Sequence, residues 1–90
     1  MNNLPQTNRR TILCHSQEGM FEVVDVEGTG IFLWVVCGGI AMYERCIRLE
    51  ESEISAFRES GESALYSIAY EVTKDKHKER EWIGDRHAPK

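Results

Sequence analysis

Residues 30–49, "GIFLWVVCGGIAMYERCIRL", contain the most apolar run of the chain, and this run restricts the possible folds. Successive side chains of a strand point to opposite faces, so a strand over 31–37 would be apolar on both faces. One face would carry Ile31, Leu33, Val35 and Cys37, and the other Phe32, Trp34 and Val36. Helices can cover one face. The other needs curling of the sheet, the C-terminal residues around Trp82, or another molecule, and we expect its cover to be partly intermolecular.

Four segments have the composition and alternation of strands, namely 10–15, 20–27, 31–37 and about 40–48. The turns between them are "SQEG", "EGTG" and Gly38-Gly39, and the last favours a two-residue hairpin. Short turns between successive strands are typical of an antiparallel meander.

After the fourth strand the hydrophobic period becomes helical. Leu65, Ile68, Ala69 and Val72 follow the spacing i, i+3, i+4, i+7. Gly61 either ends a first helix or is tolerated inside one long helix. We favour two helices, over about 50–60 and 62–77. The predicted fold is therefore α+β, with a four-stranded antiparallel meander followed by two helices packed on one face. We expect a flexible leader over 1–9, a single domain over 10–84 and a flexible tail over 85–90.

The charge of the chain is unevenly distributed. The formal net charge is −4, and residues 18–62 hold ten acidic against three basic residues. Nucleic-acid binding needs clustered Lys and Arg, so the sequence argues against a general nucleic-acid binder. An acidic middle favours solubility, and it also suits a surface that meets a basic partner.

The three cysteines, Cys14, Cys37 and Cys46, show no paired spacing, and we expect them to be reduced, buried thiols. The N-terminal residues have no apolar segment of the kind found in signal peptides. The longest apolar stretch, 31–43, is too short for a membrane helix. We therefore expect a cytoplasmic protein that does not bind membranes.

No residue pattern predicts catalysis. Cys14 and His15 are neighbours on a strand and would point to opposite faces, which makes a poor metal chelate. Cys37 precedes a glycine turn that could form an oxyanion hole, but a turn after a buried strand is the simpler interpretation. Glu22 and Glu44 could perform acid–base work across the sheet, although solvated carboxylates are commoner. We predict no catalytic residue, no metal site and no cofactor.

Residues 39–72, "GIAMYERCIRLEESEISAFRESGESALYSIAYEV", resemble small bacterial immunity proteins that block polymorphic or secreted toxins. The resemblance lies in a strand ending in an apolar-Tyr-Glu-x-x-x-Arg-Leu pattern, a short acidic helix, a glycine and a second helix. It covers about a third of the chain. The resemblance implies a small acidic protein that binds and blocks a toxin without catalysis. Immunity proteins against nucleases are often acidic, because they cover a basic active site.

We therefore predict a non-enzymatic binding protein, of the immunity or inhibitor class, that occludes a basic protein partner such as a bacterial toxin. Acidic side chains would pair with Lys and Arg of the partner, and an aromatic side chain would anchor the contact. The predicted partner-binding residues are Glu22, Asp25, Trp34, Tyr43, Glu44, Glu50, Glu51 and Glu53.

Three alternatives stay open. The acids at the start of the first helix could serve only to stabilise that helix terminus. The protein could be a homodimeric structural or regulatory module whose second sheet face is self-complementary. It could also be a small enzyme that uses Cys37 or Cys46, which we consider the weakest hypothesis.

Overall fold

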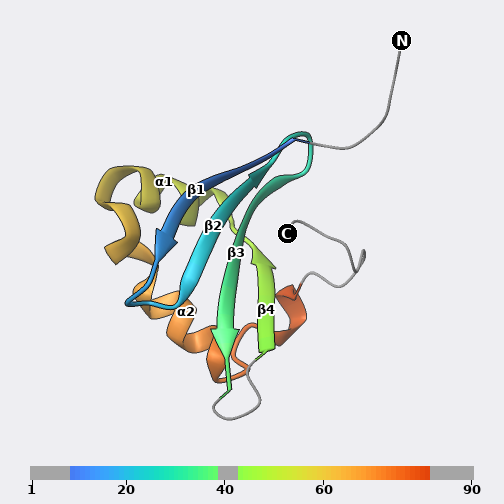
Figure 1. Ribbon diagram of the computed structural model, residues 1–90, viewed down its shortest axis with the longest axis vertical. Coiled ribbons are helices and arrows are strands. Elements are labelled where there is room, and N and C mark those ends of the chain that lie inside the picture. Colours follow the sequence, from blue (N-terminus) through green and yellow to red (C-terminus); the bar gives the residue numbers. More distant parts are fainter. Residues whose placement is uncertain (1–8, 39–42, 82–90) are drawn as a thin grey trace.

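The computed structural model describes residues 9–38 and 43–81. The predictions for the leader up to residue 8, for the C-terminal residues around Trp82 and for the tail 85–90 lie outside these residues. The predicted α+β class is confirmed, because four strands form one antiparallel sheet in the order β1-β2-β3-β4 and helices follow (Figure 1). The strands are β1 (Arg10–Ser16), β2 (Phe21–Val26), β3 (Gly30–Cys37) and β4 (Tyr43–Arg48).

The helical part of the chain is more continuous than predicted. Its elements are α1 (Glu51–Ser60), the 3-10 stretch η1 (Gly61–Leu65), α2 (Tyr66–Thr73) and the 3-10 turn η2 (Lys78–Arg80). Gly61 has a φ of 77°, which redirects the chain, but helical geometry resumes at once. The two predicted helices are thus joined into one helical stretch over 51–73.

The helical stretch also ends four residues earlier than the predicted limit of 77. The backbone N–H groups of Lys74 and Lys76 both donate to the carbonyl of Glu71. Asp75 has a φ of 63°, in the left-handed region that ends helices. The helical spacing of apolar residues stops at Val72, so nothing on the apolar face favours a longer helix.

The connection between β3 and β4 corrects the predicted hairpin. The register pairs Cys37 with Tyr43, whereas a two-residue turn at Gly38-Gly39 would pair Cys37 with Ile40. Five residues, 38–42, therefore separate the paired residues. Residues 39–42, where the fourth strand was expected to begin, lie outside the described part of the chain.

The helices cover one side of the sheet, here called the helix face (Figure 1). From β3 this face presents Ile31, Leu33, Val35 and Cys37, all buried. Leu65, Ile68 and Val72 pack on them, with Ile54 and Phe57 partly buried at the margin. Leu65, Ile68 and Val72 have the helical spacing found in the sequence, and the predicted packing of the helices on one face of the sheet is confirmed.

The other side of the sheet, here called the outer face, carries a second and smaller core. Phe32 is 0 % exposed, and Val24, Val26 and Cys46 are buried around it. Trp34 packs against this cluster and is half-buried, as is Val36. The expectation of an intermolecular cover is therefore wrong for Phe32, which is buried within the single chain.

Two arginines attach the end of the helical region to the sheet and to α1. Arg80 donates to both carboxylate oxygens of Glu53, at 2.7 and 3.1 Å, and to the carbonyl of Arg48 at 2.9 Å. Arg45 pairs with Asp75 and, at 3.1 Å, with Glu81. Because one arginine lies on β4, these pairs fix residues 75–81 against the edge of the sheet.

Candidate functional site

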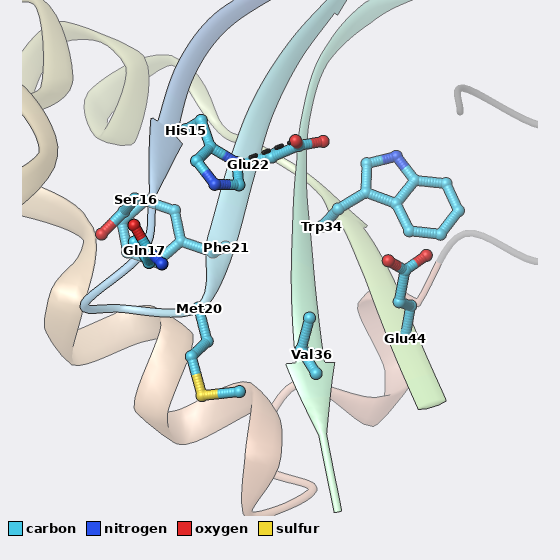
Figure 2. Close-up of a pocket in the computed structure, with 9 residues that line it drawn as sticks. All are labelled: His15, Ser16, Gln17, Met20, Phe21, Glu22, Trp34, Val36 and Glu44. Carbon is cyan, nitrogen blue, oxygen red and sulfur yellow. Dashed lines mark hydrogen bonds and ion pairs between the residues drawn. The ribbon is translucent and has the colours of Figure 1, made fainter. Parts of the chain in front are cut away.

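A hollow opens on the outer face, at the end of the sheet where β1 turns into β2. Its volume is about 180 Å³. We call it the Trp34 pocket, and Figure 2 shows the side chains that line it. They are His15, Ser16, Gln17, Met20, Phe21, Glu22, Trp34, Val36 and Glu44.

Strand register brings the polar and aromatic members of the pocket together. His15 lies opposite Glu22, and Glu22 lies opposite Trp34. Glu44 lies opposite Val36, which places it diagonal to Trp34. Side chains directly opposite have Cβ atoms about 4.5–5.5 Å apart and diagonal ones about 7–8 Å, within reach of long side chains. The indole of Trp34 therefore has a carboxylate on each of two sides.

A β-bulge determines which residue of β1 lies opposite Glu22. The pairing between β1 and β2 shifts between Ile12 and Cys14. Without the shift, alternation would turn His15 away from Glu22. With it, Nδ1 of His15 lies 2.9 Å from Oε2 of Glu22, as the dashed line in Figure 2 marks. This contact holds the Glu22 carboxylate, whose side chain is 20 % exposed.

The turn between β1 and β2 forms the lower wall of the Trp34 pocket. Oγ of Ser16, which is buried, accepts a hydrogen bond from the Gly19 N–H at 2.9 Å. A Cβ on Gly19 would lie 2.4 Å from the ring of Phe21, so only glycine fits here without a shift. Met20 then takes a φ of 59°, and its side chain is 46 % exposed. The turn thus presents a large apolar side chain beside the acidic groups.

A second hollow adjoins the first and shares Met20 and Val36 with it. It lies between the same turn and α2, where it is lined by Tyr66 and Tyr70 among others. Tyr70 is 65 % exposed. The Trp34 pocket is therefore bordered by an apolar and aromatic margin formed by Met20, Tyr66 and Tyr70.

The same turn is linked to the helices through Glu62. Its Oε2 accepts hydrogen bonds from Tyr66 and, at 3.0 Å, from Ser16. These two hydrogen bonds lower the pKa of Glu62, with the Tyr66 bond the larger cause. The carboxylate is satisfied by the groups that it joins, so we assign it a structural role.

The structure brings three of the eight predicted partner-binding residues together, namely Glu22, Trp34 and Glu44. Asp25 lies at the other end of β2, beside a shallow hollow that also contains Arg9 and Thr11. Tyr43 belongs to the helix side of β4, where the guanidinium of Arg45 lies 5.5 Å from its ring centre. Neither residue lines the Trp34 pocket.

The three predicted acids at the start of α1 have different surroundings. Glu50 and Glu53 form a capping box, in which the Glu50 N–H donates to Oε1 of Glu53 at 2.7 Å. Glu53 is also the partner of Arg80. Burial opposes the charge of Glu53, but the hydrogen bonds from Arg80 and from the Glu50 N–H outweigh it and lower its pKa. The remaining acid, Glu51, is exposed in the first turn.

Cys37 and Cys46 are buried, as predicted from the sequence, whereas Cys14 is half-buried. All three cysteines are free thiols. Burial raises the pKa of Cys37, and burial with the charge of Glu44 raises that of Cys46 to about 12. A thiol with a raised pKa is a poor nucleophile near neutral pH. Among residues 9–38 and 43–81, no group of three or more His, Cys, Asp or Glu side chains is arranged to hold a metal ion.

Several lining residues were not predicted from the sequence, and His15 and Met20 are the most important. Both depend on backbone geometry, namely a bulge in β1 and a positive φ in the turn. Neither feature has a sequence signal of the usual kind, since Met is not a residue that favours positive φ. Alternation placed Trp34 on one face of its strand, but the register that sets Glu22 opposite Trp34 was not predicted.

Comparison of the chain with protein-family models, with curated proteins and with solved structures found no significant match. Within the described residues, no helix has both the length and the apolar character needed to cross a membrane.

Proposed function

We propose that this chain is a non-enzymatic binding protein that uses the outer face of its sheet to capture and occlude a basic protein partner. A toxin of bacterial origin, bound as an immunity protein binds its target, is the partner class we favour. The observation that carries the proposal is the Trp34 pocket, where Glu22 and Glu44 lie beside an indole ring in a hollow of about 180 Å³.

The composition of the surface supports a protein partner. Trp, Tyr and Met are enriched at protein interfaces, and aromatic anchors surrounded by other contacts dominate binding energy. Here Trp34 lines the pocket together with the exposed Met20, and the adjoining hollow adds the exposed Tyr66 and Tyr70. Acidic groups next to such anchors favour a partner with Lys and Arg at the contact.

The absence of enzymatic activity is part of the proposal. It is supported by the raised pKa values of the thiols, which leave Cys37 and Cys46 protonated near neutral pH. Free thiols are also typical of a reducing compartment, so we propose that the protein acts in the cytoplasm.

Capture of the partner tests the function. The tagged protein is used as bait in a lysate of the source organism, in parallel with a Glu22→Gln/Glu44→Gln variant and a Glu59→Gln control from the exposed end of α1. We expect a basic polypeptide to be retained by the wild type and the control and lost from the double variant. The purified pair should dissociate as salt rises above about 0.1 M, because salt screens exposed charges. Equal retention by all three baits would contradict the proposal.

A homodimeric module is the second candidate, and the outer edge of β1 favours it. Ile12 and Leu13 are exposed there, at 59 % and 41 %. Exposed apolar edge strands can pair with a second copy, although the bulge in β1 opposes this. Sedimentation at several concentrations tests this candidate. A wild-type dimer that is lost in the Leu13→Lys variant supports it, and a wild-type monomer at high concentration excludes it.

A further inference from the structure

We propose that the chain forms a symmetric homodimer through the hollow that lies between the β1–β2 turn and α2. This hollow, here called the tyrosine hollow, has a volume of about 400 Å³ and is lined by Met20, Tyr66 and Tyr70 among others. Its occupant in this proposal is the same surface of a second copy of the chain. The proposal goes beyond the proposed function and does not depend on it, because self-association and capture of a basic partner are separate events.

The tyrosine hollow is bordered by apolar and aromatic side chains that the chain itself leaves exposed. Met20 is 46 % exposed, Tyr66 38 % and Tyr70 65 %. Figure 1 shows α2 next to the β1–β2 turn, so the three residues come from two elements that lie side by side. Contiguous exposed apolar surface on a small protein marks a site of association. The hollow is therefore a candidate for cover by another molecule.

The charges around the tyrosine hollow are separated along α2. Tyr66, Tyr70 and Lys74 follow one another at intervals of four residues, so they lie along one side of the helix, about 6 Å apart along its axis. Lys74, at the C-cap, places its ammonium 5.3 Å from the ring centre of Tyr70. The hydrogen bond to Glu62 raises the pKa of Tyr66 most, and the charge of Glu18, which lines the hollow from the turn, adds to the rise. The hollow is thus acidic at the Tyr66 end and basic beyond Tyr70.

This separation of charge makes the surface complementary to itself. In an interface with two-fold symmetry, residue i of one copy meets residue j of the other, and j meets i. When the two α2 helices run antiparallel across the axis, Glu18 of each copy lies near Lys74 of the other. The aromatic side chains between them, Tyr66 and Tyr70, then face the same pair, and aromatic pairs strengthen the contact. Opposite charges favour this orientation, whereas parallel helices would oppose like charges.

The same distribution of charge disfavours other occupants. A strongly basic partner would meet Lys74, and a strongly acidic one would meet Glu18, both of which are exposed. A second copy presents a matching charge to each of them. A dimer through the edge of β1 would need a regular row of backbone groups, which the shift between Ile12 and Cys14 interrupts. Packing of side chains across α2 needs no such row.

Sedimentation of the full chain between about 10 μM and 1 mM tests the proposal. The contact is small, so we expect a monomer–dimer equilibrium with a dissociation constant of roughly 0.1 mM. Tyr70→Ser should weaken the dimer by about tenfold or more, because Tyr70 is the most exposed aromatic side chain of this surface. The matched control is Tyr43→Ser, which should leave the dimer unchanged, since Tyr43 is 49 % exposed but does not line the tyrosine hollow. Circular dichroism shows that each variant is folded.

A charge exchange tests the two-fold arrangement. Glu18→Lys and Lys74→Glu should each weaken self-association by about fivefold or more, because each brings like charges together in the dimer. An equimolar mixture of the two variants should associate about as strongly as wild type, since every such contact then joins opposite charges. A local disturbance within either copy could not be repaired by mixing.

Three results would overturn the proposal. They are a wild-type monomer at about 1 mM, a dimer that Leu13→Lys dissociates and Tyr70→Ser does not, and a mixture of the charge variants that remains monomeric. If wild type is monomeric and Tyr70→Ser loses the basic polypeptide in the capture experiment, the hollow belongs to the contact with that partner instead. If the dimer forms and no basic polypeptide is captured, the homodimer stands and the proposed function fails.

Discussion

The two faces of the sheet use the same strands for different purposes. On the helix face, β3 buries Ile31, Leu33 and Val35 under the helical stretch over 51–73, and the centre of this contact is apolar. On the outer face, the buried cluster around Phe32 is small, and a pocket with two carboxylates and an indole lies beside it. The comparison shows that the helix face holds the larger core and the outer face a smaller one beside the Trp34 pocket.

The sharpest test of this comparison uses two adjacent valines of β3. Val35 is buried on the helix face and Val36 is half-buried in the wall of the Trp34 pocket. Val35→Ala should lower the free energy of unfolding by about 1.5–3 kcal/mol, because it removes buried methyl groups and leaves a cavity. Val36→Ala should cost about 1 kcal/mol or less. Urea denaturation measures both, and equal losses would mean that the two faces are packed alike.

A smaller loss of stability is expected when the contacts between Arg80 and Glu53 of α1 are removed. Arg80→Met removes the paired hydrogen bonds to Glu53 and the bond to the carbonyl of Arg48. Both side chains of the pair are mostly buried, so the variant should lose about 1–3 kcal/mol of stability. The exposed Arg58 of α1 provides the control, since Arg58→Met should change stability by no more than about 0.5 kcal/mol. If the two variants are equally stable, the Arg80 contacts do not support the helix face.

The same pair predicts how stability depends on pH. The pKa of Glu53 is lowered in the folded protein. Its contribution to stability is therefore complete above the ordinary glutamate value of 4.5 and is lost as the pH falls through the lowered pKa. Between pH 6 and pH 3, roughly, wild type should lose more stability than Glu53→Gln, by less than about 1 kcal/mol because the pair is partly screened. The control is Glu51→Gln, in the exposed first turn of α1, whose stability should depend on pH as that of the wild type does. If Glu51→Gln instead showed the same pH dependence as Glu53→Gln, the effect would not come from the Glu53–Arg80 pair.

The fold could be predicted from the sequence because its signals are local. Alternation in 31–37 placed each side chain on its face, and the spacing of Leu65, Ile68 and Val72 identified the side of the helices that packs on the sheet. A single helix through Gly61 was the alternative that the sequence did not favour, because a positive φ in glycine is compatible both with the end of a helix and with a brief 3-10 stretch.

The candidate site was predictable only in part, since it depends on register. Glu22, Trp34 and Glu44 were identified as acidic or aromatic strand residues, but nothing local showed that they lie together. His15 faces Glu22 only because β1 contains a bulge between Ile12 and Cys14. Glu53 was predicted to meet a partner, and its pairing with Arg80, 27 residues away, depends on contacts that no local pattern reveals.

The smallest stability effect is expected in the Trp34 pocket itself. Glu44 is exposed, so Glu44→Gln should change the thermal stability of the protein by no more than about 0.5 kcal/mol. Thermal unfolding followed by circular dichroism measures this. A large loss would mean that the carboxylate supports the outer face, and its role would then be structural.

The central claim is that Trp34 stands in an accessible, acidic pocket on the outer face, and fluorescence quenching tests it most directly. In a Trp82→Phe variant Trp34 is the only tryptophan, because the chain contains two. Cesium, a cation, should quench its fluorescence more strongly than iodide, an anion, since the carboxylates of Glu22 and Glu44 attract one ion and repel the other. Adding Glu22→Gln and Glu44→Gln should remove this preference. Equal shielding of Trp34 from both ions, or stronger quenching by iodide, would contradict the claim.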